Sequence, residues 1–168
     1  MKKLSVKITD VPKKVHLYTL VDGQMIKLKK NQFGAYEGEF ETEKENVAVE
    51  VFRSLELLEK LWWLYSLITF IVSVLGIFEP WYDRKCIALE CKYVVSLKET
   101  SEIKINLKPI SKEGKAVDVE SDSEVMEVNN AFYIDKKAKL RWILMLAFKI
   151  IIWIVAIILA IYFIANNI

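Results

Sequence analysis

Chemistry in this 168-residue chain would depend on very few side chains. His16 is the single histidine, and Cys86 and Cys91 are the two cysteines. A histidine next to a cysteine can activate a thiolate nucleophile, so His16 and Cys86 are a candidate pair if the two halves of the chain meet. Neither neighbourhood resembles an activated site, and His16, flanked by Val15 and Leu17, is typical of a half-exposed structural histidine. We therefore reject this pair.

The two cysteines are expected to be free thiols. Cys86 and Cys91 fall on one predicted strand, where their side chains point to opposite faces and lie about 16 Å apart along it, too far for a disulfide bond. The same geometry prevents both thiolates from binding one metal ion, and zinc would need further ligands. Free thiols favour a reducing compartment.

An acidic run in the second half of the chain could offer oxygen ligands to a cation. The run consists of Asp118, Glu120, Asp122, Glu124 and Glu127. It lacks the glycine and the closing glutamate of an EF-hand loop, so we interpret it as the solvated edge of a sheet. We expect no metal and no cofactor.

Other catalytic patterns are missing from the sequence. There is no glycine-rich phosphate loop, no pair of catalytic carboxylates and no serine-centred elbow. Lys and Arg number 24 against 22 Asp and Glu, a net charge of +2, so no strong positive field favours nucleic acid as a partner. We expect a non-enzymatic protein with no catalytic residues.

The elements around these residues include a first apolar stretch at residues 57–82. Residues 61–78 carry no charge and would form about 27 Å of helix, close to the thickness of a bilayer core. Aromatic residues flank them, as expected at two headgroup layers. These residues are Trp62, Trp63, Tyr65, Trp81 and Tyr82. We predict a first hydrophobic membrane helix here.

A second apolar stretch predicts a C-terminal transmembrane helix at residues 142–165. Its residues 142–164 are apolar or small except Lys149, and they would form about 34 Å of helix. A basic collar at residues 136–141 precedes it, and Lys149 can extend back toward the same side. The predicted membrane-surface basic residues are Lys136, Lys137, Lys139, Arg141 and Lys149. This charge bias places the central region in the cytoplasm. The first residues lack the apolar core of a signal peptide, so we expect no cleavage.

Small residues on both apolar stretches predict helix packing. In the first stretch they recur at spacings of three, four and three, and in the second they form a small-xxx-small pair. The predicted packing residues are Ser66, Thr69, Ser73, Gly76, Ala156 and Ala160. We expect the helices to pack with each other or with copies in a homo-oligomer.

The polar regions, residues 1–54 and 84–135, have the period-two pattern of β-strands. Leu4, Val6 and Ile8 alternate with polar residues, and a hairpin turn is predicted at Asp22 and Gly23. We further expect Lys27 and Lys29 to face Glu37, Glu39 and Glu41 across a hairpin, and residues 87–97 to pair with the strand of Ile103, Ile105 and Leu107. The predicted fold class is an α+β membrane protein with antiparallel, β-sandwich-like polar regions and two membrane helices.

The topology remains open at this point. Each β region has about 50 residues, too few for a robust independent core, whereas the two together would make an ordinary sandwich. A single crossing by residues 61–78 would place the two regions on opposite sides of the membrane. The alternative is a first helix that lies in the membrane or dips into it without crossing.

These patterns predict a small integral membrane protein with a β-rich module for partner binding or assembly of a membrane complex. The alternative is an immunity-type or channel- or transporter-associated subunit that acts through its helices. The expected partners are the lipid membrane and either another protein or copies of this chain. The expected location is the cell membrane, in a multi-pass or C-terminally anchored form.

Overall fold

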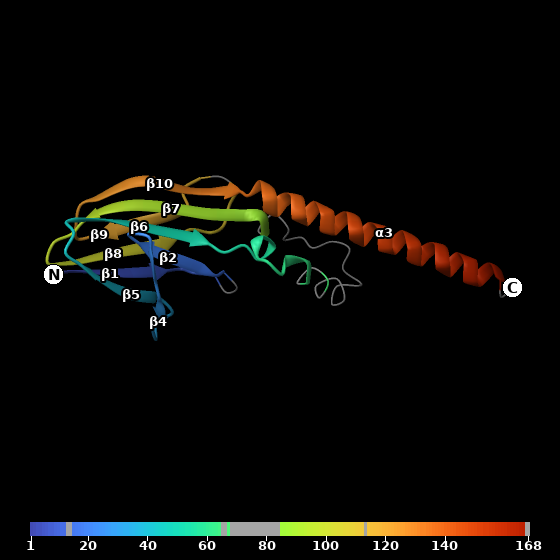
Figure 1. Cartoon of the computed structure of the whole chain (residues 1–168), viewed down its shortest axis with the longest axis horizontal. Helices are drawn as coiled ribbons and strands as arrows, with labels where there is room; N and C mark the ends of the chain where they lie inside the picture. Colours follow the sequence, from blue (N-terminus) through green and yellow to red (C-terminus); the bar gives the residue numbers. More distant parts are fainter. Residues whose placement is uncertain (13–14, 65–66, 68–84, 113, 167–168) are drawn as a thin grey trace. The chain divides into compact units, whose positions relative to one another are not determined.

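The computed structural model of this chain describes residues 1–12, 15–64, 67, 85–112 and 114–166. The chain divides into two compact units, both drawn in Figure 1. We call residues 1–55 and 87–134 the β unit, and residues 56–86 and 135–168 the helical unit. Each unit is described by itself.

The β unit consists of two five-stranded sheets. Sheet A has the strand order β4-β5-β1-β8-β9, and sheet B has the order β10-β7-β6-β2-β3. The strands of sheet A are β1 (Lys2–Thr9), β4 (Lys29–Lys30), β5 (Tyr36–Thr42), β8 (Thr100–Leu107) and β9 (Val117–Ser121). The strands of sheet B are β2 (Leu17–Val21), β3 (Gln24–Ile26), β6 (Asn46–Arg53), β7 (Ile87–Ser96) and β10 (Val125–Ile134).

One apolar core joins the two sheets. Alternate residues of β1 and β8 in sheet A and of β6 and β7 in sheet B are fully or almost fully buried in a single cluster. Because side chains alternate across a strand, one face of each sheet supplies this cluster. Leu4, Ile105, Val49 and Tyr93 are representative members. The predicted α+β class, with mainly antiparallel sheets in a sandwich-like arrangement, is therefore confirmed in outline.

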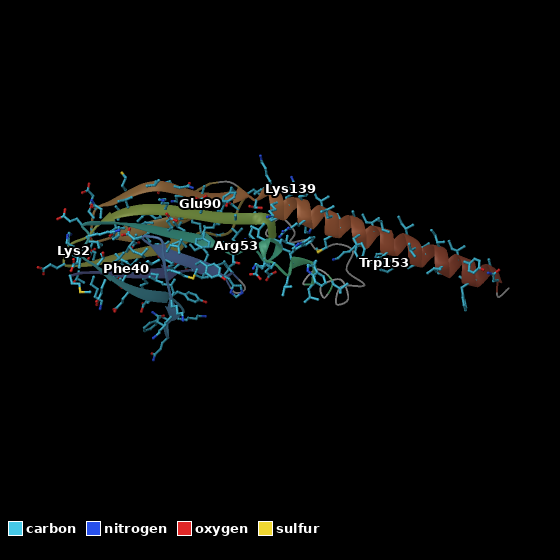
Figure 2. The ribbon with its side chains drawn as sticks, in the orientation of Figure 1. Lys2, Phe40, Arg53, Glu90, Lys139 and Trp153 are labelled. Atoms are coloured by element: carbon cyan, nitrogen blue, oxygen red, sulfur yellow. The ribbon has the colours of Figure 1, made fainter. Side chains whose placement is uncertain are left out.

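The two halves of the chain are interleaved within both sheets. In sheet A, β1 pairs in parallel with β8, and in sheet B, β6 pairs antiparallel with β7. Arg53, labelled in Figure 2, is the last residue of β6. Its side chain donates from Nη1 to the carbonyl oxygen of Ile87 at 2.9 Å. Residues 54–86 therefore leave and re-enter the β unit on neighbouring strands. A single passage of the first apolar stretch through a membrane is incompatible with this pairing.

The expected strand partners near residue 97 are wrong. β7 pairs with β6 and β10, whereas β8 pairs with β1 and β9 in the other sheet. The short connection after β7 crosses between the sheets instead of forming a hairpin. Alternation of apolar residues cannot distinguish these two outcomes, because both bury the same faces.

The expected lysine partners of β5 are confirmed only in part. Lys3 of β1 lies 2.8 Å from Glu39, and Lys7 of β1 lies 3.0 Å from Glu37. Lys29 faces Glu37 across β4 and β5, as expected, but in the described part of the chain the cations that pair with Glu37 and Glu39 come from β1. β5 runs between β4 and β1, so its glutamates have two neighbouring strands from which to draw a cation.

The predicted turn at Asp22 and Gly23 is confirmed. Both residues have positive φ angles, 50° and 77°, as a type I′ turn requires. Asp22 Oδ1 accepts a hydrogen bond from Ala48 N at 2.9 Å, and Asp22 Oδ2 lies 2.7 Å from Lys44 Nζ. The turn between β2 and β3 is thus fastened to the start of β6.

In the helical unit, a short 3-10 helix, η1 (Glu56–Leu58), follows the β unit, and a long helix, α3 (Lys136–Asn166), follows β10. Asp135 caps α3, because its Oδ1 accepts from Ala138 N at 2.7 Å. Within the part of the chain that the structure describes, α3 is the one helix long and apolar enough to cross a membrane. Most of the first predicted membrane helix, including residues 68–84, lies outside the described residues, so two membrane helices are not shown.

Candidate functional site

The predicted helix-packing residues fall in two places. Ser66, Thr69, Ser73 and Gly76 lie outside the described residues. Ala156 and Ala160 are on α3 and are exposed. The apolar side chains of α3 are exposed along almost all of its length, as expected of a helix whose surroundings are lipid or another helix.

The predicted basic collar is part of α3 itself. The helix begins at Lys136, so Lys136, Lys137 and Lys139 project from its first turn and are exposed; Figure 2 labels Lys139 there. Lys149, further along the helix, is half-buried.

Arg141 differs from the other collar residues because it is engaged within the unit. Its Nη1 donates to the carbonyl oxygen of Leu57 at 2.6 Å, and its guanidinium lies 5.0 Å from the centre of the Trp62 ring. Beside these groups, Leu57 and Ala138 are buried. Arg141 therefore fixes the segment that follows η1 to the start of α3 through a charge-assisted hydrogen bond and a cation–π interaction.

Sequence reasoning missed this interaction, although it singles out both partners. The aromatic pattern places Trp62 at a headgroup layer, and the charge pattern places Arg141 at the membrane surface. Both patterns place these residues at the same depth of a membrane, where their side chains could meet. This shared depth is the signal that could have indicated the contact. Their separation of more than 70 positions conceals it.

An apolar groove opens on one side of the β unit. It encloses about 450 Å³ and is lined by residues of β1 to β5 and of the connections between them. The apolar lining includes Val11, Leu17, Met25, Ile26 and Leu28. Lys27, Lys29 and His16 also line the groove. His16 thus lies at a surface groove, and its carbonyl oxygen accepts a hydrogen bond from Ser54 N.

A polar cleft of about 400 Å³ lies on the side formed by β9 and β10. Asn130 of β10 holds this side together: its Oδ1 accepts from the N–H groups of Ala116 and Val117, both at 3.0 Å, and its Nδ2 donates to the carbonyl oxygen of Val117 at 2.9 Å. The buried Tyr93 hydroxyl, which also lines the cleft, has no hydrogen-bond partner among the described residues.

The acidic run lies along β9, the following turn and β10. Three of its five members serve separate structural interactions: Asp118 pairs with Lys108 at 2.8 Å, Asp122 accepts from Glu102 N, and Glu127 pairs with Lys115. Within the described ranges, no group of three or more His, Cys, Asp or Glu side chains is placed to hold a metal ion.

The two cysteines are free and buried. Cys91 lies in β7, whereas Cys86 precedes that strand. Burial raises the pKa of the Cys91 thiol to about 12, with further contributions from Glu127 and Glu90, so its thiolate is scarce at neutral pH. Such a thiol is a poor nucleophile.

Comparison with protein-family models, with curated proteins and with solved structures finds no match to this chain.

Proposed function

We propose that this protein is a non-enzymatic binding module, anchored in the cell membrane by α3, whose β unit binds a partner protein on the cytoplasmic side. The apolar and exposed surface of α3 supports the anchor. The exposed lysines at its start support a cytoplasmic β unit, because loops rich in Lys and Arg stay inside.

The pairing of β6 with β7 supports a β unit that lies wholly on one side of the membrane. Since the sheets draw strands from both sides of the first apolar stretch, the whole β unit stands on one side of any membrane that α3 crosses. The ends of β6 and β10 and the start of β7 lie together, because Arg53 contacts Ile87 and Ile134 pairs with Ile87. The chain therefore connects to both apolar stretches from one end of sheet B.

The apolar groove is the single observation that carries partner binding. Apolar side chains such as Met25, which is 60% exposed, line a concave surface beside the edge strands β3 and β4. An edge strand offers unpaired N–H and C=O groups, and a neighbouring apolar groove can accept alternate side chains of an added strand. Lys27 and Lys29 favour a partner segment that is apolar with acidic flanks.

Photo-crosslinking in the full-length, membrane-inserted chain tests the proposal. A photoreactive residue at Met25 should give a discrete adduct with one protein, and Leu28→Asp, which places a charge in the groove, should abolish it. The matched control is Phe33, which is 94% exposed in the turn before β5 and does not line the groove. Identical adducts at both positions would contradict groove binding.

The alternative function, a membrane subunit that acts through its helices, is favoured by the uncovered apolar face of α3 that carries Ala156 and Ala160. A photoreactive residue at Ala156 distinguishes the two functions. An adduct at Ala156, with none at Met25, would support the helix-based function in place of the groove.

A further inference from the structure

The segment after η1 exposes several large apolar side chains. Leu61, Trp63, Leu64 and Leu67 are between 37% and 60% exposed. Among the described residues of this segment, Trp62–Leu64 and Leu67 are helical. Exposed tryptophan and leucine side chains gathered on so short a segment are costly in water, and they are typical of a surface that contacts lipid or protein.

Cations are frequent in this segment and at the start of α3. Lys60 is exposed within the segment, and Lys136, Lys137 and Lys139 are exposed on the first turn of α3. Arg141 joins the two pieces through Leu57 and Trp62. Residues 56–64 and 135–141 hold five cations against three carboxylates, and one of these carboxylates, Asp135, caps α3. This combination matches an anionic lipid surface.

The chain's connections hold the segment beside the start of α3, so an α3 that crosses a membrane would bring the segment to the leaflet where the helix begins. Residues 54–86 start and finish on neighbouring strands of sheet B, and Asp135 N donates to the carbonyl oxygen of Cys86 at 2.9 Å. The segment after η1, the return to β7 and the start of α3 are thus tied together within the helical unit. Tryptophan and lysine at that level correspond to the headgroup layer.

We infer that Leu57–Leu64 together with Leu67, which we call the interfacial element, is a second membrane-binding surface that lies in the headgroup layer of an anionic bilayer. The inference rests on the proposed anchoring by α3 and adds to it. The exposed Leu and Trp side chains enter the upper acyl region, the lysines face anionic headgroups, and Arg141 keeps the element beside α3.

A depth measurement on the full-length chain tests this placement. Single cysteines at Leu64, Leu159 or Phe33 carry an environment-sensitive fluorophore, in vesicles of phosphatidylcholine and phosphatidylserine that contain shallow or deep spin-labelled quencher lipids. The two native cysteines are buried and should stay unlabelled in the folded protein. The probe at Phe33, on the β unit, should report water.

The proposal expects shallow quenching at Leu64 and deep quenching at Leu159. A probe at Leu64 that behaves like the one at Phe33, or that is quenched only by deep labels, would overturn the interfacial placement. A water-like probe at Leu159 would instead overturn the anchor, so the two failures are distinguishable. In vesicles of phosphatidylcholine alone the quenching at Leu64 should fall while that at Leu159 stays; an unchanged Leu64 signal would refute the role of anionic lipid.

Arg141→Gln tests whether Arg141 holds the element in place. The substitution removes the hydrogen bond to the Leu57 carbonyl oxygen and the cation–π interaction with Trp62, so shallow quenching at Leu64 should fall by roughly half. Lys137→Gln removes the same charge from an exposed position and is the matched control. Equal effects of the two substitutions would show that charge alone places the element and that Arg141 does not position it.

Discussion

Replacing Asn130 by alanine should destabilise the β unit severely, because this side chain joins β10 of sheet B to the start of β9 in sheet A. It accepts from Ala116 N and Val117 N and donates to the Val117 carbonyl oxygen. Ala116 and Val117 are almost completely buried, so water cannot readily replace the amide.

The magnitude follows from the groups left without a partner. A buried N–H or C=O that loses its hydrogen bond costs about 1–3 kcal/mol. Asn130→Ala leaves two N–H groups and one C=O in that state, and local relaxation will recover part of the loss. We expect about 3 kcal/mol in total, a large share of the stability of a typical domain.

Two matched variants sharpen the assay. Asn130→Asp keeps an acceptor for the two N–H groups but loses the donor to Val117 and brings a second carboxylate next to Glu127, to which Asn130 donates at 3.0 Å; it should lose about half as much free energy of unfolding. Asn129→Ala removes an amide at the neighbouring position and should change that free energy by less than about 0.5 kcal/mol.

Urea unfolding of the full-length chain in mild detergent, followed by the circular dichroism of the sheets, measures these differences. With a slope of about 2 kcal/mol per molar urea, Asn130→Ala should lower the midpoint by about 1.5 M. If its midpoint matches that of Asn129→Ala, the two sheets do not depend on this amide and the reasoning fails.

Three further predictions concern the turn before β3 and the thiol of β7. The hydrogen bonds from Lys44 and from Ala48 N lower the pKa of Asp22, so the ionised Asp22 side chain stabilises the fold above the unfolded pKa of about 3.9, and this stabilisation is lost as the pH falls through the folded pKa. Asp22→Asn should therefore make the free energy of unfolding less dependent on pH in the acid range. An unchanged dependence would contradict this explanation. Gly23→Ala should lower the free energy of unfolding by about 1 kcal/mol in thermal or urea unfolding, because the φ angle of +77° disfavours a residue with a Cβ. A steric clash is not the cause, since an added Cβ would meet nothing within 4 Å. Gly23→Asn should cost less, and the reverse order would refute the conformational explanation. Cys91, fully buried with its pKa raised to about 12, should react with iodoacetamide at neutral pH only after unfolding, and mass spectrometry that finds modification of the folded protein would disprove its protection.

The strands are predictable from the sequence because each has a strong local signal. Leu4, Val6 and Ile8 alternate without interruption, and the Asp22–Gly23 pair has few conformations other than the turn that it forms. The pairing of strands has no such signal. β6 and β7 are separated by residues 54–86, and nothing in the local sequence of either strand indicates that they pair with each other.

The candidate site is predictable in its parts but not in its assembly. The lysines of the collar are recognisable by their place before an apolar stretch, which is a property of the sequence alone. The role of Arg141 depends on the position of Leu57 and Trp62, which the sequence does not encode locally. The Asn130 bridge escapes prediction for the same reason, since a single asparagine within a strand carries no pattern.

The interleaving of the sheets has a consequence for the order of events on the ribosome. β1 and β6 emerge long before β8 and β7, which are their partners, and at synthesis rates of about 5–20 residues per second the wait lasts roughly 2–20 s. During that interval the first half of the chain has open strand edges, and the first apolar stretch emerges before its flanking strands can pair. Unpaired strand edges and the exposed apolar stretch, each of which promotes aggregation, are therefore present at the same time. Early capture of the nascent chain, by a chaperone or by the membrane surface, would shelter both until translation supplies the missing strands.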